Sequence, residues 1–466
     1  MKRFLAATAL LALIALSFTA CGGGSSSSSS SSKNNGGATQ AHVFVTGEDA
    51  PVSSVVAFNI TINQITLNNG STSVVAMNTP TAVDFGHLVG LRSLLGFNSI
   101  APGTYNSATV TFATNPAPTI DYIDLTTSTP SLGTATGVLS NAKVTVAFPS
   151  NQPLVVGSSD MAGLHLDFDL RDSLAINNGN LVITNGQIAI NPVLEVVAVS
   201  AASDLGQITD FTGNVVSVTT NSFVLQGPYG FQEMIDVNPS TQYNNGDTLA
   251  SLLVNGIVSV EGTVQSDGSI LASSVELITT DQAFLGGRIL AVDPGPVVTM
   301  FVGEQLGTSA TIPVDSIQTV NLSQVNNWDI CFIDNWFTNE LFGPAYLVVG
   351  QRIFVGGTYQ SKVFTPTMVS LRRQGIVGSL VQGPVTSVSQ NIGDFEMQND
   401  ALLSYAAGGG PFPVATDNQT VFVNIDGLMG LESAGAANLV VTGLVFDNPQ
   451  ALGTPVAWVH RVRVLP

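Results

Sequence analysis

Three side chains of types that bind metal ions alternate along one short segment, at His165, Asp167 and Asp169. The residues between them, within Leu164–Phe168, are apolar, so the segment has the pattern of a strand with one buried face. Alternate residues of a strand lie about 6.5–7 Å apart and share a face. The three polar side chains are therefore a candidate metal site.

Calcium is the cation that this face would bind, because hard cations take several carboxylate oxygens. Further ligands would have to come from a neighbouring loop, where Asp160 or Asp172 could provide them. The alternative is a solvated outer face whose acids are neutralised by Arg171. The sequence leaves both interpretations open and suggests no other cofactor.

Aromatic residues gather in a second segment that is rich in Asn and Asp. Trp328, Phe332, Trp336 and Phe337 lie between positions 328 and 337. Such rings could stack on sugar faces while the polar groups bind the hydroxyls, which makes these four residues a candidate ligand-binding loop. The alternative is a lid whose rings pack against a barrel end.

No combination of residues in the sequence specifies a catalytic activity. Ser140 and Lys143 match the Ser-x-x-Lys pattern of acyl-transferring hydrolases, but they lead into an alternating strand. That chemistry places the pair on one turn of a helix. Cys331 has no histidine or basic residue near it in the sequence, so we expect an inert buried thiol. We therefore expect that the protein is not an enzyme.

The candidate residues would be positioned by strands rather than by helices. After residue 40 the sequence shows short apolar/polar alternation that Gly, Pro or Asn interrupts about every ten residues. The clearest helical segment is Leu88 to Leu95. A change of phase in the alternation predicts a β-bulge at Asn63-Gln64. We predict an all-β protein in which a β-sandwich precedes three small OB-like β-barrels.

An internal repeat supports the three barrels. Each copy has about five predicted strands, a number that suits a small closed barrel without exposed edges. We expect the sandwich at residues 41–199 and the copies at 206–280, 286–373 and 375–466. From Thr319 to Gly350 the second copy is about 16 residues longer than the first, and this excess contains the aromatic segment.

The N-terminus has the features of a secretion signal. A short basic start precedes the apolar run Phe4 to Leu16, which is too short to cross a bilayer permanently. Thr19-Ala20-Cys21 resembles the bacterial lipobox, which implies removal of residues 1–20 and lipidation of Cys21. The alternative is an ordinary cleaved signal.

The segment after the signal favours an anchored protein. Residues 21–40 are rich in Gly and Ser, with eight consecutive serines, and would form a flexible tether. Gly22 rather than Asp follows the cysteine, which by resemblance to known lipoprotein sorting favours the outer membrane. We expect a cell-envelope protein that is bound to the membrane through its lipid and faces the periplasm or the outside.

Composition excludes nucleic acid as a partner. The chain has 466 residues and a net charge of -19, with Lys+Arg 13 against Asp+Glu 32. An acidic protein without a basic cluster lacks the electrostatic attraction that dominates nucleic-acid binding.

Two parts of the chain resemble known families. Glu48-Asp49-Ala50-Pro51, Val83-Asp84-Phe85, Pro102-Gly103-Thr104-Tyr105 and Leu166-Asp167-Phe168-Asp169 occur in the order seen in the bacterial lipoprotein family called domain of unknown function 4382, over about residues 41–197. The later copies resemble domain of unknown function 5666, most clearly in the first copy. Both resemblances imply secreted β-domains, and neither implies a catalytic residue.

These observations predict a lipid-anchored binding or structural protein of the cell envelope that contacts glycans or envelope proteins. The prediction rests on analogy of architecture. One alternative is a sugar-active hydrolase that uses scattered carboxylates such as Asp167, Asp169 and Glu195. A second alternative is a pilus-like or surface-layer subunit.

Overall fold

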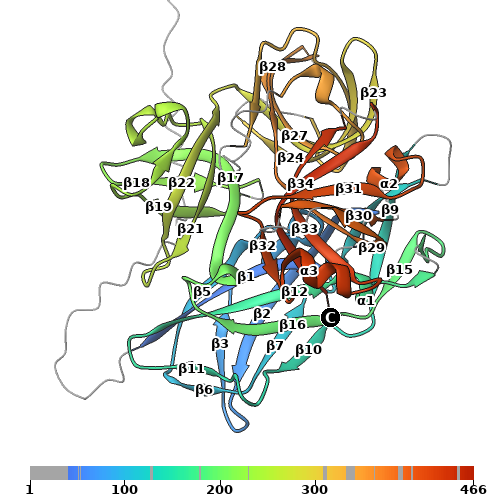
Figure 1. Ribbon diagram of the computed structural model, residues 1–466. Helices are drawn as coiled ribbons and strands as arrows, with labels where there is room; N and C mark the ends of the chain where they lie inside the picture. Colours follow the sequence, from blue (N-terminus) through green and yellow to red (C-terminus); the bar gives the residue numbers. More distant parts are fainter. Residues whose placement is uncertain are drawn as a thin grey trace, which may run out of the picture. The chain divides into compact units, whose positions relative to one another are not determined.

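β-Strands form most of the regular structure, which confirms the predicted all-β fold (Figure 1). The structure is a computed structural model that describes residues 40–465 except 51, 53, 126–129, 178–179, 229, 308–311, 332–341, 362, 387–391, 400–401 and 449–451. Within this part the helices are short: α1 (Leu170–Ser173), α2 (Leu402–Ala406), α3 (Gly427–Ser433) and the 3-10 turns η1 (Phe85–His87), η2 (Asp204–Gly206), η3 (Asn244–Gly246), η4 (Leu249–Ser251) and η6 (Pro344–Tyr346).

The N-terminal module contains a four-stranded and an eight-stranded sheet. The smaller sheet has the order β16-β12-β1-β5, and the larger follows β10-β7-β2-β8-β9-β15 with β3 and β4 also paired to β2. The strands are β1 (Ala41–Ala50), β2 (Val55–Asn68), β3 (Ser73–Met77), β4 (Thr81–Asp84), β5 (Ser93–Ile100), β7 (Ser107–Phe112), β8 (Thr119–Asp124), β9 (Ser131–Leu139), β10 (Lys143–Ala147), β12 (Met161–Asp169), β15 (Gln187–Ile190) and β16 (Leu194–Val199). Two small pairs join β6 (Gly103–Tyr105) to β11 (Leu154–Val156) and β13 (Ile176–Asn177) to β14 (Asn180–Leu181).

One hydrophobic core lies between the two sheets, as in a β-sandwich. Leu164, Leu166 and Phe168 of β12 are all buried in it. The ring of Phe168 packs against Phe58 and Phe112 of the opposite sheet, at 5.1 and 5.7 Å between centroids. The alternating pattern therefore predicts the inward face of β12 correctly.

Of two local predictions in the sandwich, one is confirmed and one is wrong. The pairing of β2 with β7 shifts register between Ile62 and Gln64, where the bulge was expected. Leu88–Leu95 is not a helix, because Gly90 has a φ of 63° and β5 begins at Ser93. So short a helix is marginal without tertiary support, and here sheet pairing supplies the more favourable alternative.

Three six-stranded sheets with the same order of strands follow the sandwich, at residues 207–279, 283–371 and 374–464. Their orders are β19-β18-β17-β21-β22-β20, β25-β24-β23-β27-β28-β26 and β31-β30-β29-β33-β34-β32. In the third sheet β31 also pairs with β34, and in the first β19 also pairs with β22, so each closes a ring of five strands. This closure agrees with the predicted small barrels for the first and third sheets.

The strand bounds of the three sheets are as follows. The first contains β17 (Gln207–Val218), β18 (Ser222–Gln226), β19 (Gln232–Asp236), β20 (Gln242–Tyr243), β21 (Ile257–Val264) and β22 (Ile270–Thr279). The second contains β23 (Ala283–Asp293), β24 (Val297–Leu306), β25 (Ser316–Asn321), β26 (Asn327–Ile330), β27 (Arg352–Gln360) and β28 (Val363–Leu371). The third contains β29 (Gln374–Thr386), β30 (Gly393–Gln398), β31 (Phe412–Thr416), β32 (Val421–Val423), β33 (Asn438–Asp447) and β34 (Pro455–Val464).

The extra chain of the second repeat begins later than expected. Strand β26 pairs in parallel with β28 at the edge of its sheet, the place that β20 has in the first sheet. Thr319 lies in β25 and so corresponds to a strand before Thr241. The aligned repeats are therefore displaced by one strand, because strands this short carry too little pattern to set the alignment.

Candidate functional site

The predicted metal residues lie on β12, but two of them are buried. His165 is 2% and Asp167 is 6% exposed, so the fully solvated face of the alternative interpretation is wrong. Asp169 instead accepts a hydrogen bond from the backbone N–H of Asp172 and caps α1. Among the residues that the structure describes, no group of three or more His, Cys, Asp and Glu side chains could hold a metal ion. The three side chains have separate partners, and calcium binding by them stays a prediction.

A buried carboxylate, that of Glu48, lies beside His165 on this face of β12. Glu48 of β1 is 0% exposed, and guanidinium nitrogens of Arg92, Arg461 and Arg463 lie 3.6–3.8 Å from its oxygens. Burial raises the pKa of Glu48, but the arginines outweigh this effect and hold the pKa below its ordinary value. With His165, these residues form the Glu48 cluster, which joins the sandwich to β34 of the third sheet.

His165 is a neutral member of the cluster. Burial lowers its pKa to about 4, the charge of Glu48 opposes this effect, and the neighbouring arginines add to it. The hydroxyl of Thr46 lies 3.0 Å from the carbonyl oxygen of Leu205, which can only accept, so the hydroxyl donates there. The same hydroxyl oxygen can accept from Nδ1–H of His165 at 3.2 Å. This tautomer leaves Nε2 of His165 as an acceptor.

A cleft of about 990 Å³ lies beside the Glu48 cluster. Its lining residues come from β12, β16 and α1 of the sandwich, from β32 and β34 of the third sheet, and from the segment at 200–205. The cleft contains the predicted His165, Asp167 and Asp169 together with Glu195. The structure thus brings into one cleft the three carboxylates that the hydrolase alternative named.

Asp167 and Glu195 face each other in this cleft. They are register partners in the antiparallel pairing of β12 with β16, which places their Cβ atoms about 4.5–5.5 Å apart. Burial raises the pKa of Asp167 to about 7 although Arg463 lowers it, and the charges of Glu48 and Glu195 add to the rise. Nη2 of Arg463 lies 3.3 Å from Oδ2 of Asp167. The cleft therefore holds one acid that titrates near neutral pH.

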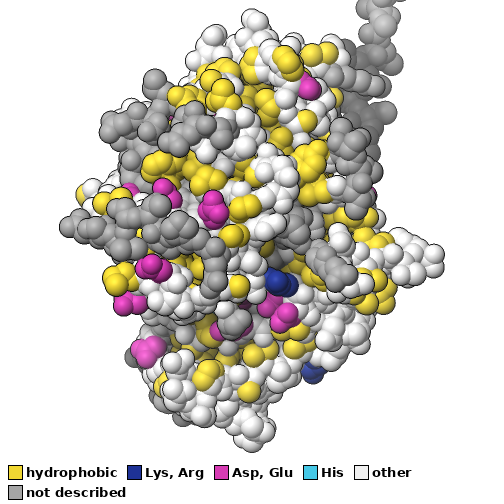
Figure 2. Space-filling view, turned by 45° about the vertical axis from the view of Figure 1, so that its right-hand side comes forward, with side chains coloured by type: hydrophobic (Ala, Val, Ile, Leu, Met, Phe, Trp, Pro, Cys, Tyr) yellow, Lys and Arg dark blue, Asp and Glu magenta, His cyan; other side chains and the backbone are white. Residues whose placement is uncertain are grey.

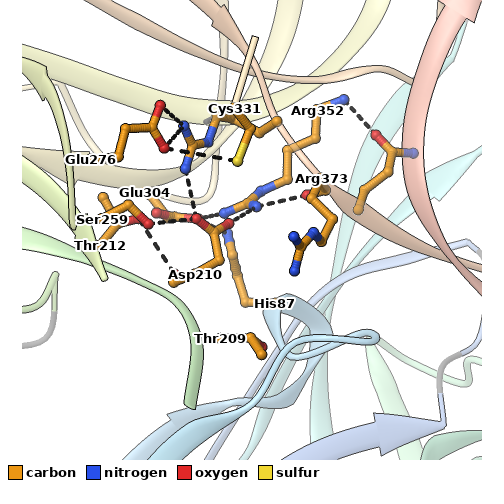
Figure 3. Close-up of polar contacts among 12 residues, drawn as sticks. His87, Thr209, Asp210, Thr212, Ser259, Glu276, Glu304, Cys331, Arg352 and Arg373 are labelled. Atoms are coloured by element: carbon orange, nitrogen blue, oxygen red, sulfur yellow. Dashed lines mark hydrogen bonds and ion pairs between the residues drawn. The ribbon is translucent and has the colours of Figure 1, made fainter. Parts of the chain in front are cut away.

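A second buried network joins the sandwich to the first two repeat sheets (Figure 3). We call it the charge chain, because acids and bases alternate along it with N–O distances of 2.5–3.1 Å. Its members in order are Asp84, His87, Glu304, Arg352, Asp210, Arg372 and Glu276. At its end the thiol of Cys331 lies 3.8 Å from Oε2 of Glu276. Cys331 is buried, as expected, but it has charged neighbours that its sequence surroundings did not reveal.

The members of the charge chain set one another's protonation. Burial lowers the pKa of His87, but hydrogen bonds to Asp84 and Glu304 outweigh it and raise the pKa to about 10. Burial raises the pKa of Glu304, but Arg352 and His87 lower it to about 2. Asp210 is likewise held well below its ordinary pKa by Arg372 and Arg352, despite its burial. His87, Glu304 and Asp210 are therefore charged at neutral pH.

The backbone of β17 directs the side chain of Asp210 into the charge chain. Asp210 has a φ of 50° at a register shift between Ile208 and Phe211. The left-handed region is unfavourable for most residues but less so for Asp, and such a bulge re-aims a side chain. The two guanidinium groups that Asp210 binds, of Arg352 and Arg372, also lie over the ring of Phe354, at 4.8 and 4.6 Å from its centroid.

Trp328 follows the packing alternative rather than an open ligand-binding loop. It lies in β26, and its ring packs edge-on against Phe342 at 5.5 Å in the core of the second sheet. Its indole N–H donates to the carbonyl oxygen of Val325 at 3.1 Å. The other residues predicted here, Phe332, Trp336 and Phe337, lie outside the described residues, as does Cys21.

Sequence reasoning missed both charged networks. Their members are dispersed along the chain, and the available signal was a charged residue inside an otherwise apolar strand, as at Glu276 and Glu304. A second signal was the small number of basic residues. The chain has only 13 Lys and Arg, and several of the arginines are buried. Few Lys and Arg side chains appear on the face shown in Figure 2.

Two family models match the chain. Residues 40–185 match the model described as Domain of unknown function (DUF4382), and residues 212–276 match that described as Domain of unknown function (DUF5666). Their identity and order are those that the sequence resemblances predict. No curated protein and no solved structure matches the chain. Within the described residues there is no helix with the length and apolar character to cross a membrane.

Proposed function

We propose that this protein is a lipid-anchored, non-catalytic component of the cell envelope that acts through binding or as a structural element. A lipid on Cys21 would hold it to the outer membrane, with the Gly/Ser-rich segment as a tether. The basic start, the short apolar run and the lipobox-like Thr19-Ala20-Cys21 support this anchor.

The charge chain is the observation that carries the proposal for the folded body. It ties the sandwich to the first two repeat sheets through buried ion pairs, and the Glu48 cluster adds the third. Removing one partner of a buried pair leaves an uncompensated buried charge and costs about 3–5 kcal/mol, so the charges buried in one module depend on those of its neighbours. β-Modules joined through such buried pairs suit a protein that presents surfaces to neighbours in the envelope.

Detergent phase partitioning of the full chain, expressed with its signal, tests the anchor. We expect the wild type in the detergent phase and Cys21→Ser in the aqueous phase. Cys331→Ser changes the other cysteine and should stay with the wild type. Wild-type protein in the aqueous phase would refute the anchor. Pull-down of the mature protein with purified envelope polymers and proteins tests binding, and protease treatment of intact cells tests the side that it faces.

The opposed Asp167 and Glu195 favour a sugar-active hydrolase as a second candidate. Two carboxyl groups can act as acid and base or as acid and nucleophile, and one of these titrates near neutral pH. Release of reducing ends from neutral polysaccharides should then occur with the wild type and be lost in both Asp167→Asn and Glu195→Gln. If the wild type releases none, this candidate is rejected.

A further inference from the structure

Buried polar atoms without a hydrogen-bond partner line the cleft beside the Glu48 cluster. They are Oδ1 of Asp167, Nε2 of His165, and the Nε atoms of Arg461 and Arg463. Asp167, His165 and Arg461 are each at least nine-tenths buried. Unpaired polar groups at buried positions cost free energy, and a ligand that bonded to them would recover it. The cleft is therefore suited to a polar ligand.

The charges around the cleft argue against an anion. The arginines are already engaged, since Arg461 pairs with Asp204 at 2.7 Å and Arg463 pairs with Asp167 at 3.3 Å. Both also lie near the buried carboxylate of Glu48. An anionic ligand would then meet the remaining acids of the lining, which are Asp169, Asp172 and Glu195. A neutral ligand avoids this repulsion.

The unpaired atoms of the cleft include both donors and acceptors. Oδ1 of an ionised Asp167 and Nε2 of His165 accept, whereas Nε–H of Arg461 and Arg463 donates. A hydroxyl group both donates and accepts, so adjacent hydroxyls of one ring can satisfy both kinds of partner. Valine side chains at positions 197, 421 and 423 line the walls and offer apolar contact for C–H groups. A cleft of about 990 Å³ is at the upper end of the range of small-molecule sites.

We infer that this cleft binds a neutral saccharide, with Asp167 and Glu195 accepting from its hydroxyls and Arg461 and Arg463 donating to them. The inference rests on the proposed binding function and adds the site and the class of ligand. The ligand can be a free oligosaccharide or a glycan chain of an envelope polymer, because both present the same hydroxyls.

Calorimetric titration of the mature protein in a non-glycosidic detergent tests the site. The probes are cellohexaose, maltohexaose and chitohexaose, with polygalacturonate as the anionic comparison and purified peptidoglycan sacculi as the polymer arm. We expect at least one neutral probe to bind and polygalacturonate to bind more weakly. Glu195→Gln and Asp167→Asn should each weaken that binding about tenfold or more. Glu396→Gln changes an exposed glutamate of β30, outside the cleft, and should bind as the wild type does.

Hydrogen exchange of the wild type gives a second measurement that does not depend on how the variants fold. Protection by the bound saccharide should appear at residues 163–169, 194–199 and 421–424. Binding that is unchanged in both cleft variants, protection elsewhere, preference for polygalacturonate, or no binding of any neutral probe would each overturn the inference. None of these outcomes alters the partitioning of the wild type into detergent, so the anchor is judged separately.

Discussion

Arg372 donates to the carboxylate of Asp210 at 2.7 Å although the two residues are 162 positions apart. Both side chains are buried, and the pair joins β17 of the first repeat sheet to the residue that directly follows β28 of the second. Arg372 also pairs with Glu276 at 2.8 Å, so one guanidinium neutralises two buried carboxylates. This residue is where the charge chain can be broken most directly.

Arg372→Met should destabilise the protein by about 3–5 kcal/mol, because it leaves Glu276 and Asp210 with one buried partner fewer. Urea unfolding followed by circular dichroism measures the change. Arg171→Met replaces an exposed arginine and should stay within about 0.5 kcal/mol of the wild type. Equal unfolding midpoints for the two variants would show that the charge chain does not hold the modules together.

His87 should make the protein less stable at alkaline pH. Its pKa in the folded protein is about 10, above the ordinary value of 6.5, because Asp84 and Glu304 bond to the protonated ring. The contribution is therefore complete below about pH 6.5 and is lost as the pH rises to about 10. Melting temperatures between pH 6 and 10 should fall more steeply for the wild type than for His87→Gln. Parallel curves would contradict the prediction.

Asp167 should also make the protein less stable as the pH rises, although the cause is burial of a carboxyl group rather than bonds to a protonated ring. Burial raises its pKa from 3.8 to about 7, so the folded protein holds this proton more tightly than the unfolded chain. Its contribution to stability therefore falls as the pH rises from about 4 to about 7. Asp167→Asn should gain stability relative to the wild type between pH 4 and 8, whereas Asp293→Asn, on the exposed end of β23, should not. Unfolding in denaturant at both pH values measures the difference.

Gly375 should tolerate no side chain. A Cβ at this position would clash with the backbone carbonyl of Val89, where the sandwich meets the third sheet. Gly375→Ala should therefore cost about 1–3 kcal/mol through forced movement of backbone. Gly343→Ala places its Cβ in open space and should be nearly neutral. Thermal unfolding of both variants checks this, and a stable Gly375→Ala would mean that the two modules do not meet as closely as described.

The local sequence pattern was sufficient to predict these strands and their buried faces. The alternation in Leu164–Phe168 and the phase change near Asn63 each depend on residues that are neighbours in sequence, so the inward face of β12 and the bulge of β2 could be predicted. The short apolar run at Leu88 was misassigned because its conformation is decided by what it pairs with.

The periodicity of a strand does not reveal which residues pack against each of its faces. Alternation places His165 and Asp167 opposite the core, but the residue that pairs with Asp167 is Arg463, 296 positions further along the chain. The ionisation of Glu48, His87 and Asp167 likewise depends on charges that only folding brings near. The sequence by itself thus determined that the folded body is built of β-strands and which face of β12 is buried, whereas the anchor that it indicates stays a prediction. Tertiary structure decided which charges are buried together, because electrostatic energy depends on distance and on exclusion of water rather than on position along the chain.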